Sequence, residues 1–179
     1  MSECYRLNVA GLIRDLPVCP VNETLSIAAF VMFSDVELTV ACATALLDKV
    51  PDFDVLITAE SKGIPLAYEM SRQSGKKYFL ARKSKKLYMR RPIEVDVKSI
   101  TTTTLQTLYL DCDDMSGLQD KKVLVVDDVI STGESLEALK LLVQKAGGNI
   151  VACATVLAEG DAAKRNDIIF LAPLPLFIK

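Results

Sequence analysis

Short apolar runs and apolar residues at helical spacing follow one another in the second half of the chain. Residues 122–126 form a β-branched apolar run, which is typical of a strand buried on both faces. After a polar loop, apolar residues recur at helical spacing over 136–146, and two glycines then end the pattern. Residues 150–157 form a second apolar run. The order strand, loop, helix, strand predicts a βαβ unit and hence a parallel sheet.

The same order of elements recurs upstream, where strands are predicted over 54–58 and 77–81 with a short helix over 64–71 between them. Between 87 and 110 apolar and polar residues alternate, which predicts a partly exposed β-hairpin. The tail over 171–177 is apolar but holds two prolines, so it cannot form a central strand or a helix. We expect it to be irregular and to pack over the rest of the protein.

Two predicted helices have candidate N-terminal caps. Asp35 precedes a helical stretch that extends to about Lys49. For the helix over 136–146, Ser131 or Ser135 is the candidate cap. We expect the apolar side of the first helix to consist of Val36, Val40, Ala43 and Leu47.

Length and composition indicate a single domain spanning residues 1–179, of which 50% is apolar and 25% charged. The net charge of −2 gives no general attraction to nucleic acid. The longest apolar stretch, 27–33, falls short of the roughly 18 residues of a membrane span, and the first residues lack the layout of a signal peptide. Because the five cysteines are widely spaced, we expect reduced thiols in a cytoplasmic protein. From the charge and the short apolar stretches we expect no nucleic-acid or membrane partner.

The candidate chemistry is limited by the absence of histidine, which excludes His triads, His metal sites and His general bases. The strongest candidate is the segment 123–135, in which Asp127 and Asp128 follow a buried strand and a short loop leads into a helix. Ligands bind at the carboxyl ends of strands in open parallel sheets. Free amides at a helix N-terminus attract one phosphate, while two carboxylates accept hydrogen bonds from a vicinal diol. Ribose 5-phosphate matches both parts of the segment, with its phosphate at the free amides and its hydroxyls at the carboxylates. The alternative is an acidic turn that only caps the helix.

This segment resembles the phosphoribosyl-diphosphate signature of type I phosphoribosyltransferases at every constrained position. The resemblance implies an α/β fold with a central, mainly parallel sheet flanked by helices, a small hood and a mobile β-hairpin loop. It also implies that Asp127 and Asp128 hold the ribose hydroxyls and take part in catalysis. The 5-phosphate would then be bound by the loop residues Ile130, Ser131, Thr132, Gly133, Glu134 and Ser135. The segment lacks the spacing and the lysine of a Walker-type phosphate loop.

Two further segments match the same family. The stretch after the strand at 54–58 resembles the family's diphosphate loop, which implies diphosphate contacts from Glu60, Ser61, Lys62 and Gly63. From Arg82 to Arg91 the sequence holds six cations in ten positions, which is usually a solvated basic loop. Because this run resembles the Arg-Lys-x-x-Lys-Leu stretch of adenine and xanthine phosphoribosyltransferases, it implies that Arg82 and Lys86 contact the diphosphate and act in catalysis.

The N-terminal region carries a looser match. Residues 9–15 resemble the Gly-x-x-Phe-Arg-Asp entry of adenine phosphoribosyltransferases with one residue fewer, which implies that Leu12, Ile13 and Arg14 contact the base. The implied hood comprises about residues 1–34 and the tail 168–179. In that family the mobile loop also carries a Glu-Tyr-Gly, whereas here residues 98–104 hold neither acid nor glycine. We expect Ser99 to Thr104 to close over the ribose.

The resemblance implies an enzyme that transfers 5-phosphoribose from phosphoribosyl diphosphate to adenine, giving AMP and diphosphate in purine salvage. It further implies a homodimer and a Mg²⁺ ion bound through the diphosphate and ribose rather than directly by protein side chains. Two alternatives stay open. Residues 98–104 are somewhat closer to xanthine phosphoribosyltransferases, which accept 6-oxopurines. Purine-responsive repressors use a similar domain as a sensor, and residues 62–68 match their Lys-Gly-Ile-Pro-Leu-Ala-Tyr.

Overall fold

A parallel five-stranded sheet forms the centre of the protein. The computed structural model describes residues 4–98 and 105–178. The sheet has the order β10-β9-β8-β4-β5, and every pair in it is parallel. Its strands are β4 (Val55–Ala59), β5 (Tyr78–Ala81), β8 (Lys122–Ile130), β9 (Asn149–Glu159) and β10 (Ile169–Leu174). This arrangement confirms the predicted α/β fold, with β8, the helix α4 (Glu134–Lys145) and β9 as the predicted βαβ unit.

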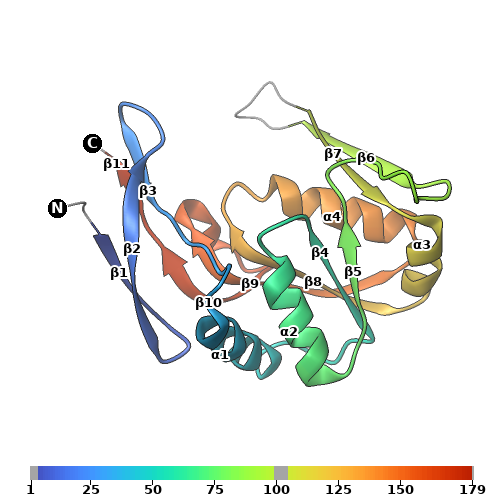
Figure 1. Cartoon of the computed structure of the whole chain (residues 1–179), viewed down its shortest axis with the longest axis horizontal. Coiled ribbons are helices and arrows are strands. Elements are labelled where there is room, and N and C mark those ends of the chain that lie inside the picture. Colours follow the sequence, from blue (N-terminus) through green and yellow to red (C-terminus); the bar gives the residue numbers. More distant parts are fainter. Residues whose placement is uncertain (1–3, 99–104, 179) are drawn as a thin grey trace.

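Helices cover both faces of the central sheet (Figure 1). The helices α1 (Val36–Leu47) and α2 (Ile64–Ser74) share one hydrophobic core with Leu124 and Val126 of β8. The helices α3 (Cys112–Leu118) and α4 (Glu134–Lys145) share a second core with Val123 and Val125. Successive residues of a strand point to opposite faces, so an unbroken apolar run in β8 can supply both cores.

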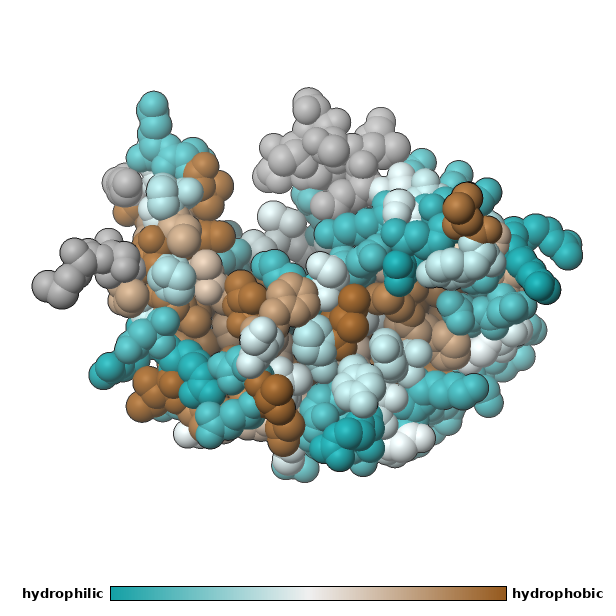
Figure 2. Space-filling view, in the orientation of Figure 1, coloured by the Kyte–Doolittle hydropathy of each residue, from teal (hydrophilic) through white to brown (hydrophobic). Residues whose placement is uncertain are grey.

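A second, smaller sheet lies beside the main body (Figure 1). It consists of β1 (Cys4–Val9), β2 (Leu12–Pro20), β3 (Leu25–Ala28) and β11 (Leu176–Ile178), in the order β1-β2-β3-β11. The C-terminal strand therefore joins the N-terminal hairpin, with Leu176 opposite Ile27. Figure 2 shows a notch between this small sheet and the rest of the molecule.

The predicted hairpin is present as the antiparallel pair β6 (Ile93–Lys98) and β7 (Leu105–Leu110). Two backbone hydrogen bonds between Arg82 and Tyr109, each of 2.8 Å, join β7 to the segment that follows β5. The predicted closure by Ser99 to Thr104 lies outside the described residues. A short 3-10 helix, η1 (Gly160–Lys164), connects β9 to the last strands.

Three local predictions are wrong. The tail is not irregular: residues 169–174 form an edge strand of the main sheet, where a proline is tolerated, and 176–178 join the small sheet. Neither serine caps α4, because Gly133 is its N-cap residue and no side chain caps it. The apolar side of α1 is rotated from the predicted one, because this helix is apolar almost all round. The buried residues of α1 are Leu38, Thr39, Cys42, Ala43 and Leu46, whereas Val36 is 73% exposed.

Candidate active site

The predicted site residues follow neighbouring strands of the main sheet. Asp127 and Asp128 lie in the last part of β8, Glu60 to Gly63 follow β4, and Arg82 follows β5. The chain runs outward from β4 to β5 and then returns to the other side of β4 with β8. Open α/β sheets bind ligands where the strand order reverses in this way. The topology thus brings the three loops together at one edge of the sheet.

The loop after β8 wraps a small cavity of about 120 Å³, lined by Asp127 and by Val129 to Leu136. The predicted phosphate residues Ile130, Ser131, Thr132, Gly133, Glu134 and Ser135 all line it. Gly133 adopts φ +86°, a left-handed conformation that favours glycine, and serves as the N-cap residue of α4. Because no side chain caps α4, the amides of its first turn are available to an anion in this cavity.

A second helix starts in the same manner. Gly63 is the N-cap residue of α2 and again no side chain caps the helix. Both helix N-termini follow strands that end at the same edge of the sheet, after β4 and after β8. The site therefore offers two partial positive charges, one for each end of a ligand that carries two anionic groups.

Gly63, in the loop after β4, lies directly against Asp127 in the last part of β8. A Cβ atom at this position would overlap Thr58 Oγ1 and would lie 2.9 Å from Asp127 Oδ1. Real Cβ atoms essentially never approach a neighbour so closely. Only glycine lets the loop after β4 pack this closely against the Asp127 carboxylate.

The carboxylates of Asp127 and Asp128 lie among polar groups but are largely buried from solvent. Asp128 is 5% exposed, and its Oδ2 atom is buried without a hydrogen-bond partner. The Asp128 amide donates a hydrogen bond of 2.9 Å to Asp127 Oδ1. Burial raises the pKa of both carboxyl groups above the usual range, and the charge of Asp128 raises that of Asp127 further. Lys62 opposes the rise in the pKa of Asp128.

The basic segment lies beside the same loops. Arg82 Nη2 forms an ion pair of 3.4 Å with Glu60 Oε1, and the Lys83 amide donates a 3.0 Å hydrogen bond to Glu60 Oε2. That hydrogen bond, together with nearby cations, lowers the pKa of Glu60. Lys86 donates to Ser84 Oγ within its own loop. Arg82 Nε is buried without a partner, so the guanidinium keeps one donor for a ligand.

Unpaired buried polar atoms gather at the ends of the three strands. Among the described residues they are Thr58 Oγ1, Arg82 Nε and Asp128 Oδ2. Buried polar groups are nearly always hydrogen-bonded, and leaving one unpaired costs about 1–3 kcal/mol. Three such atoms at the ends of neighbouring strands indicate polar groups to which a ligand can supply the missing hydrogen bonds.

A larger cavity of about 280 Å³ adjoins the phosphate loop. Its polar lining comes from Lys62, Asp128, Ser131 and Glu159, and its apolar lining comes from the segment 27–31 with Val129 and Leu174. Leu12, Ile13 and Arg14 do not line it. Ile13 is 57% exposed, and Arg14 forms ion pairs of 2.7 Å with Asp35 and Glu37.

The sequence did not predict that residues 27–31 and Glu159 line this cavity. Residues 27–31 belong to the apolar stretch that precedes the cap Asp35, and nothing in their pattern marks them as ligand contacts. Glu159 ends the apolar strand β9, where a single acidic residue gives no motif. Only the folded protein brings residues 27–31 to one cavity with the ends of β8, β9 and β10.

The pattern of the phosphoribosyl transferase domain family matches residues 38–172, and the chain belongs to this family. An adenine phosphoribosyltransferase of Thermosipho africanus is 29% identical over 173 residues, covering 92% of this chain and 98% of that protein. A hypoxanthine/guanine phosphoribosyltransferase of Methanothermococcus okinawensis is 36% identical over 111 residues, covering 62% of this chain and 56% of that protein.

Solved structures show the same fold. The crystal structure of adenine phosphoribosyltransferase from Thermoanaerobacter pseudethanolicus matches with a TM-score of 0.70 at 17% identity, covering 88% of this chain and 95% of that one. The protein is thus a phosphoribosyltransferase of the type I fold, as its sequence motifs predict.

The contact between Gly63 and Asp127 predicts a selective loss of ligand binding in Gly63→Ala. The added methyl group must displace the diphosphate loop or the Asp127 carboxylate, at a cost of about 1–3 kcal/mol. We expect affinity for ribose 5-phosphate, measured by calorimetry, to fall about tenfold or more. Gly75→Ala is the matched control: Gly75 has φ +70° but open space around it, so that variant should lose stability and keep its affinity. Equal affinities in wild type and Gly63→Ala would contradict this account.

The raised pKa values of Asp127 and Asp128 predict that binding of ribose 5-phosphate strengthens with pH, because only the ionised carboxyl groups accept hydrogen bonds from both hydroxyls. Between about pH 5 and pH 8 the affinity of the wild type should rise more steeply than that of Asp127→Asn. The ligand's own phosphate, with a second pKa of about 6, contributes equally to both proteins. Identical slopes would contradict the assignment.

The free energy of unfolding of the wild type and of Asp127→Asn provides the control for this comparison of affinities. A carboxyl group with a raised pKa makes the folded protein bind more protons than the unfolded chain, so its contribution to stability falls as the pH rises. Asp127→Asn should therefore be at least as stable as the wild type at about pH 8, and a weaker affinity cannot then be attributed to unfolding.

Proposed function

We propose that this enzyme transfers 5-phosphoribose from phosphoribosyl diphosphate to adenine, giving AMP and diphosphate. The observation that carries the proposal is the meeting of two uncapped helix N-termini and a carboxylate pair at one edge of the sheet. The likeness to an adenine phosphoribosyltransferase over 92% of the chain supports adenine as the base. The larger cavity, with its apolar walls, is a suitable size and character for a flat purine ring.

In the proposed reaction the bond between ribose C1 and the diphosphate oxygen breaks, and a bond from C1 to a ring nitrogen of adenine forms. That nitrogen loses its proton, which the departing diphosphate takes up. Negative charge grows on the departing diphosphate, where Arg82, Lys86 and Lys62 stabilise it. Positive charge grows on the ribose ring. Asp127 and Asp128 hold the ring hydroxyls and stabilise that charge.

A Mg²⁺ ion fits the chemistry of this site. Magnesium prefers oxygen ligands and binds with few protein carboxylates when phosphate oxygens are present. The unpaired Asp128 Oδ2 is a suitable neighbour, and within residues 4–98 and 105–178 no group of three or more acidic or cysteine side chains is arranged to hold a metal ion by itself. Substrate oxygens would supply most of the coordination, and the ion would neutralise charge on the diphosphate.

We also propose a cytoplasmic location, which is supported by the cysteines. Among the described residues none of the five forms a disulfide bond, as is typical of a reducing compartment. Within the described parts of the chain, no helix combines the length and the apolar character needed to cross a bilayer.

The second candidate function is transfer to a 6-oxopurine. It is favoured by the hypoxanthine/guanine phosphoribosyltransferase relative, although the likeness covers only 62% of this chain. Adenine presents a donor at position 6 and a 6-oxopurine an acceptor, so one pocket cannot serve both well. A mismatched buried partner costs about 1–3 kcal/mol, which separates the two bases by tenfold or more.

Steady-state kinetics with phosphoribosyl diphosphate, Mg²⁺ and each of adenine, hypoxanthine, guanine and xanthine tests the proposal. We expect kcat/KM for adenine to exceed the other values by about tenfold or more. A preference for a 6-oxopurine would replace adenine and leave the ribose site unchanged. Ligand binding without turnover of any base would identify a sensor.

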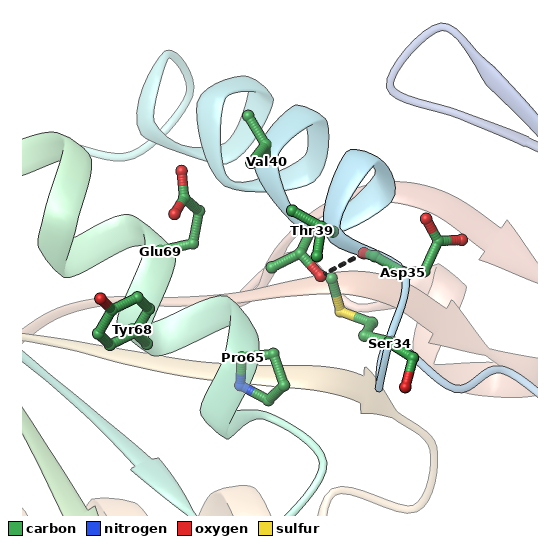
Figure 3. Close-up of a pocket in the computed structure, with 9 residues that line it drawn as sticks. Ser34, Asp35, Thr39, Val40, Pro65, Tyr68 and Glu69 are labelled. Carbon is green, nitrogen blue, oxygen red and sulfur yellow. Dashed lines mark hydrogen bonds between the residues drawn. The ribbon is translucent and has the colours of Figure 1, made fainter.

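The proposed assembly is a homodimer formed through α1 and α2. Figure 3 shows Thr39 and Val40 of α1 facing Pro65 and Tyr68 of α2 across a groove of about 210 Å³. The groove continues into an exposed apolar surface, and Figure 2 shows hydrophobic side chains over α1 and the segment before it. We call this surface the α1 patch; it consists of Val31, Phe33, Val36, Val40 and Tyr68. Contiguous apolar patches of this kind mark protein interfaces.

Sedimentation velocity tests the dimer. We expect a particle of twice the 19.6 kDa chain mass for the wild type and a monomer for Val36→Asp combined with Val40→Asp, because each buried carboxylate would lack a partner. Leu141→Asp is the matched control, since Leu141 is 43% exposed on α4, away from the α1 patch, and that variant should remain dimeric. A monomeric wild type would overturn the proposed dimer.

A further inference from the structure

Glu159 lines the larger cavity but has no part in the ribose or phosphate contacts described above. It is the last residue of β9, directly after Ala158, which pairs with Ile130 of β8. On its other side it pairs with Leu174 of β10. This register places Glu159 beside the start of the phosphate loop, and Ser131 lines the same cavity.

The carboxylate of Glu159 has no partner within the described residues. No hydrogen bond or ion pair involves it, although the residue is only partly exposed. The nearby carboxylate of Asp161 differs, because it is 94% exposed and forms an ion pair of 2.7 Å with Lys164. A half-buried carboxylate without a protein donor is stabilised by any ligand that brings an N–H or O–H group into the cavity.

The phosphates, the ribose and the base differ in the hydrogen-bond donors that they offer to the Glu159 carboxylate. The 5-phosphate and the diphosphate are anions, which a carboxylate repels. The ribose hydroxyls are matched by Asp127 and Asp128. The base remains, and it enters a cavity whose apolar walls include Phe30, Val129 and Leu174.

We infer that Glu159 is a specificity-determining residue that accepts a hydrogen bond from the exocyclic amino group of the purine. This inference deepens the proposed function and rests on it. An ionised carboxylate only accepts hydrogen bonds, so it favours an amino group at position 6 and disfavours an oxo group there. A glutamine at the same position can donate as well as accept, and it tolerates either substituent.

Two variants and one control test the inference. Glu159→Gln keeps the shape and removes the charge, and Glu159→Ala removes the acceptor. Asp161→Asn makes the same charge change two residues away, outside the larger cavity. For each protein, affinities for AMP and ribose 5-phosphate are measured by calorimetry, and kcat/KM is measured with adenine and hypoxanthine.

We expect Glu159→Gln and Glu159→Ala to bind AMP about ten- to a hundredfold more weakly, with affinity for ribose 5-phosphate unchanged, because that ligand lacks the base. The ratio of kcat/KM for adenine to that for hypoxanthine should fall about tenfold in Glu159→Gln and stay constant in Asp161→Asn. Equal weakening of AMP and ribose 5-phosphate would show that Glu159 supports the phosphate loop and would overturn the inference. So would an unchanged base preference in an active Glu159→Gln variant, which would leave the phosphoribosyl transfer itself intact.

Discussion

The contact between Gly63 and Asp127 is the constraint on which the rest of the site depends. It joins the loop after β4 to the last part of β8, and it leaves no room for a Cβ atom between them. Because both loops lead directly into helices, this contact also fixes the separation of the N-termini of α2 and α4. A ligand with a phosphate at each end can then meet both helix ends at once, with its sugar on the carboxylates between them.

The same packing gives the two carboxylates an unfavourable electrostatic environment. Asp127 and Asp128 adjoin each other in a poorly solvated position, so their pKa values rise, and Asp128 Oδ2 has no hydrogen-bond partner. Such an arrangement lowers the stability of the free protein. Under the proposed function, a ribose hydroxyl supplies the hydrogen-bond donor that Asp128 Oδ2 lacks among the described residues. A preorganised acceptor pair needs little rearrangement as charge develops on the sugar.

Local sequence predicts the segment after β8 but not the walls of the larger cavity. The segment from Asp127 to Ser135 is contiguous, so its strand, loop and helix could be predicted directly. The larger cavity combines residues 27–31, Glu159 and Leu174, which come together only in the folded protein. The predicted base contacts at 12–14 lie in β2 and do not line this cavity, and their role stays a prediction. The proline-containing tail was misjudged because a proline is tolerated in a strand at the edge of the sheet, and the sequence pattern does not show which strand lies there.

Some site residues are contiguous in the sequence and others come together only in the fold, and this difference accounts for how much of the chain each relative matches. The family match begins at residue 38 and ends at 172, so it contains the N-termini of α2 and α4 and Glu159 but excludes residues 27–31 and Leu174. The hypoxanthine/guanine relative covers 62% of the chain, whereas the adenine relative covers 92%. Under the proposed function, phosphoribosyl transfer depends on the part of the chain that both relatives match. The choice of base then depends on Glu159 together with cavity residues outside the family match, and these can change without disturbing the contact between Gly63 and Asp127.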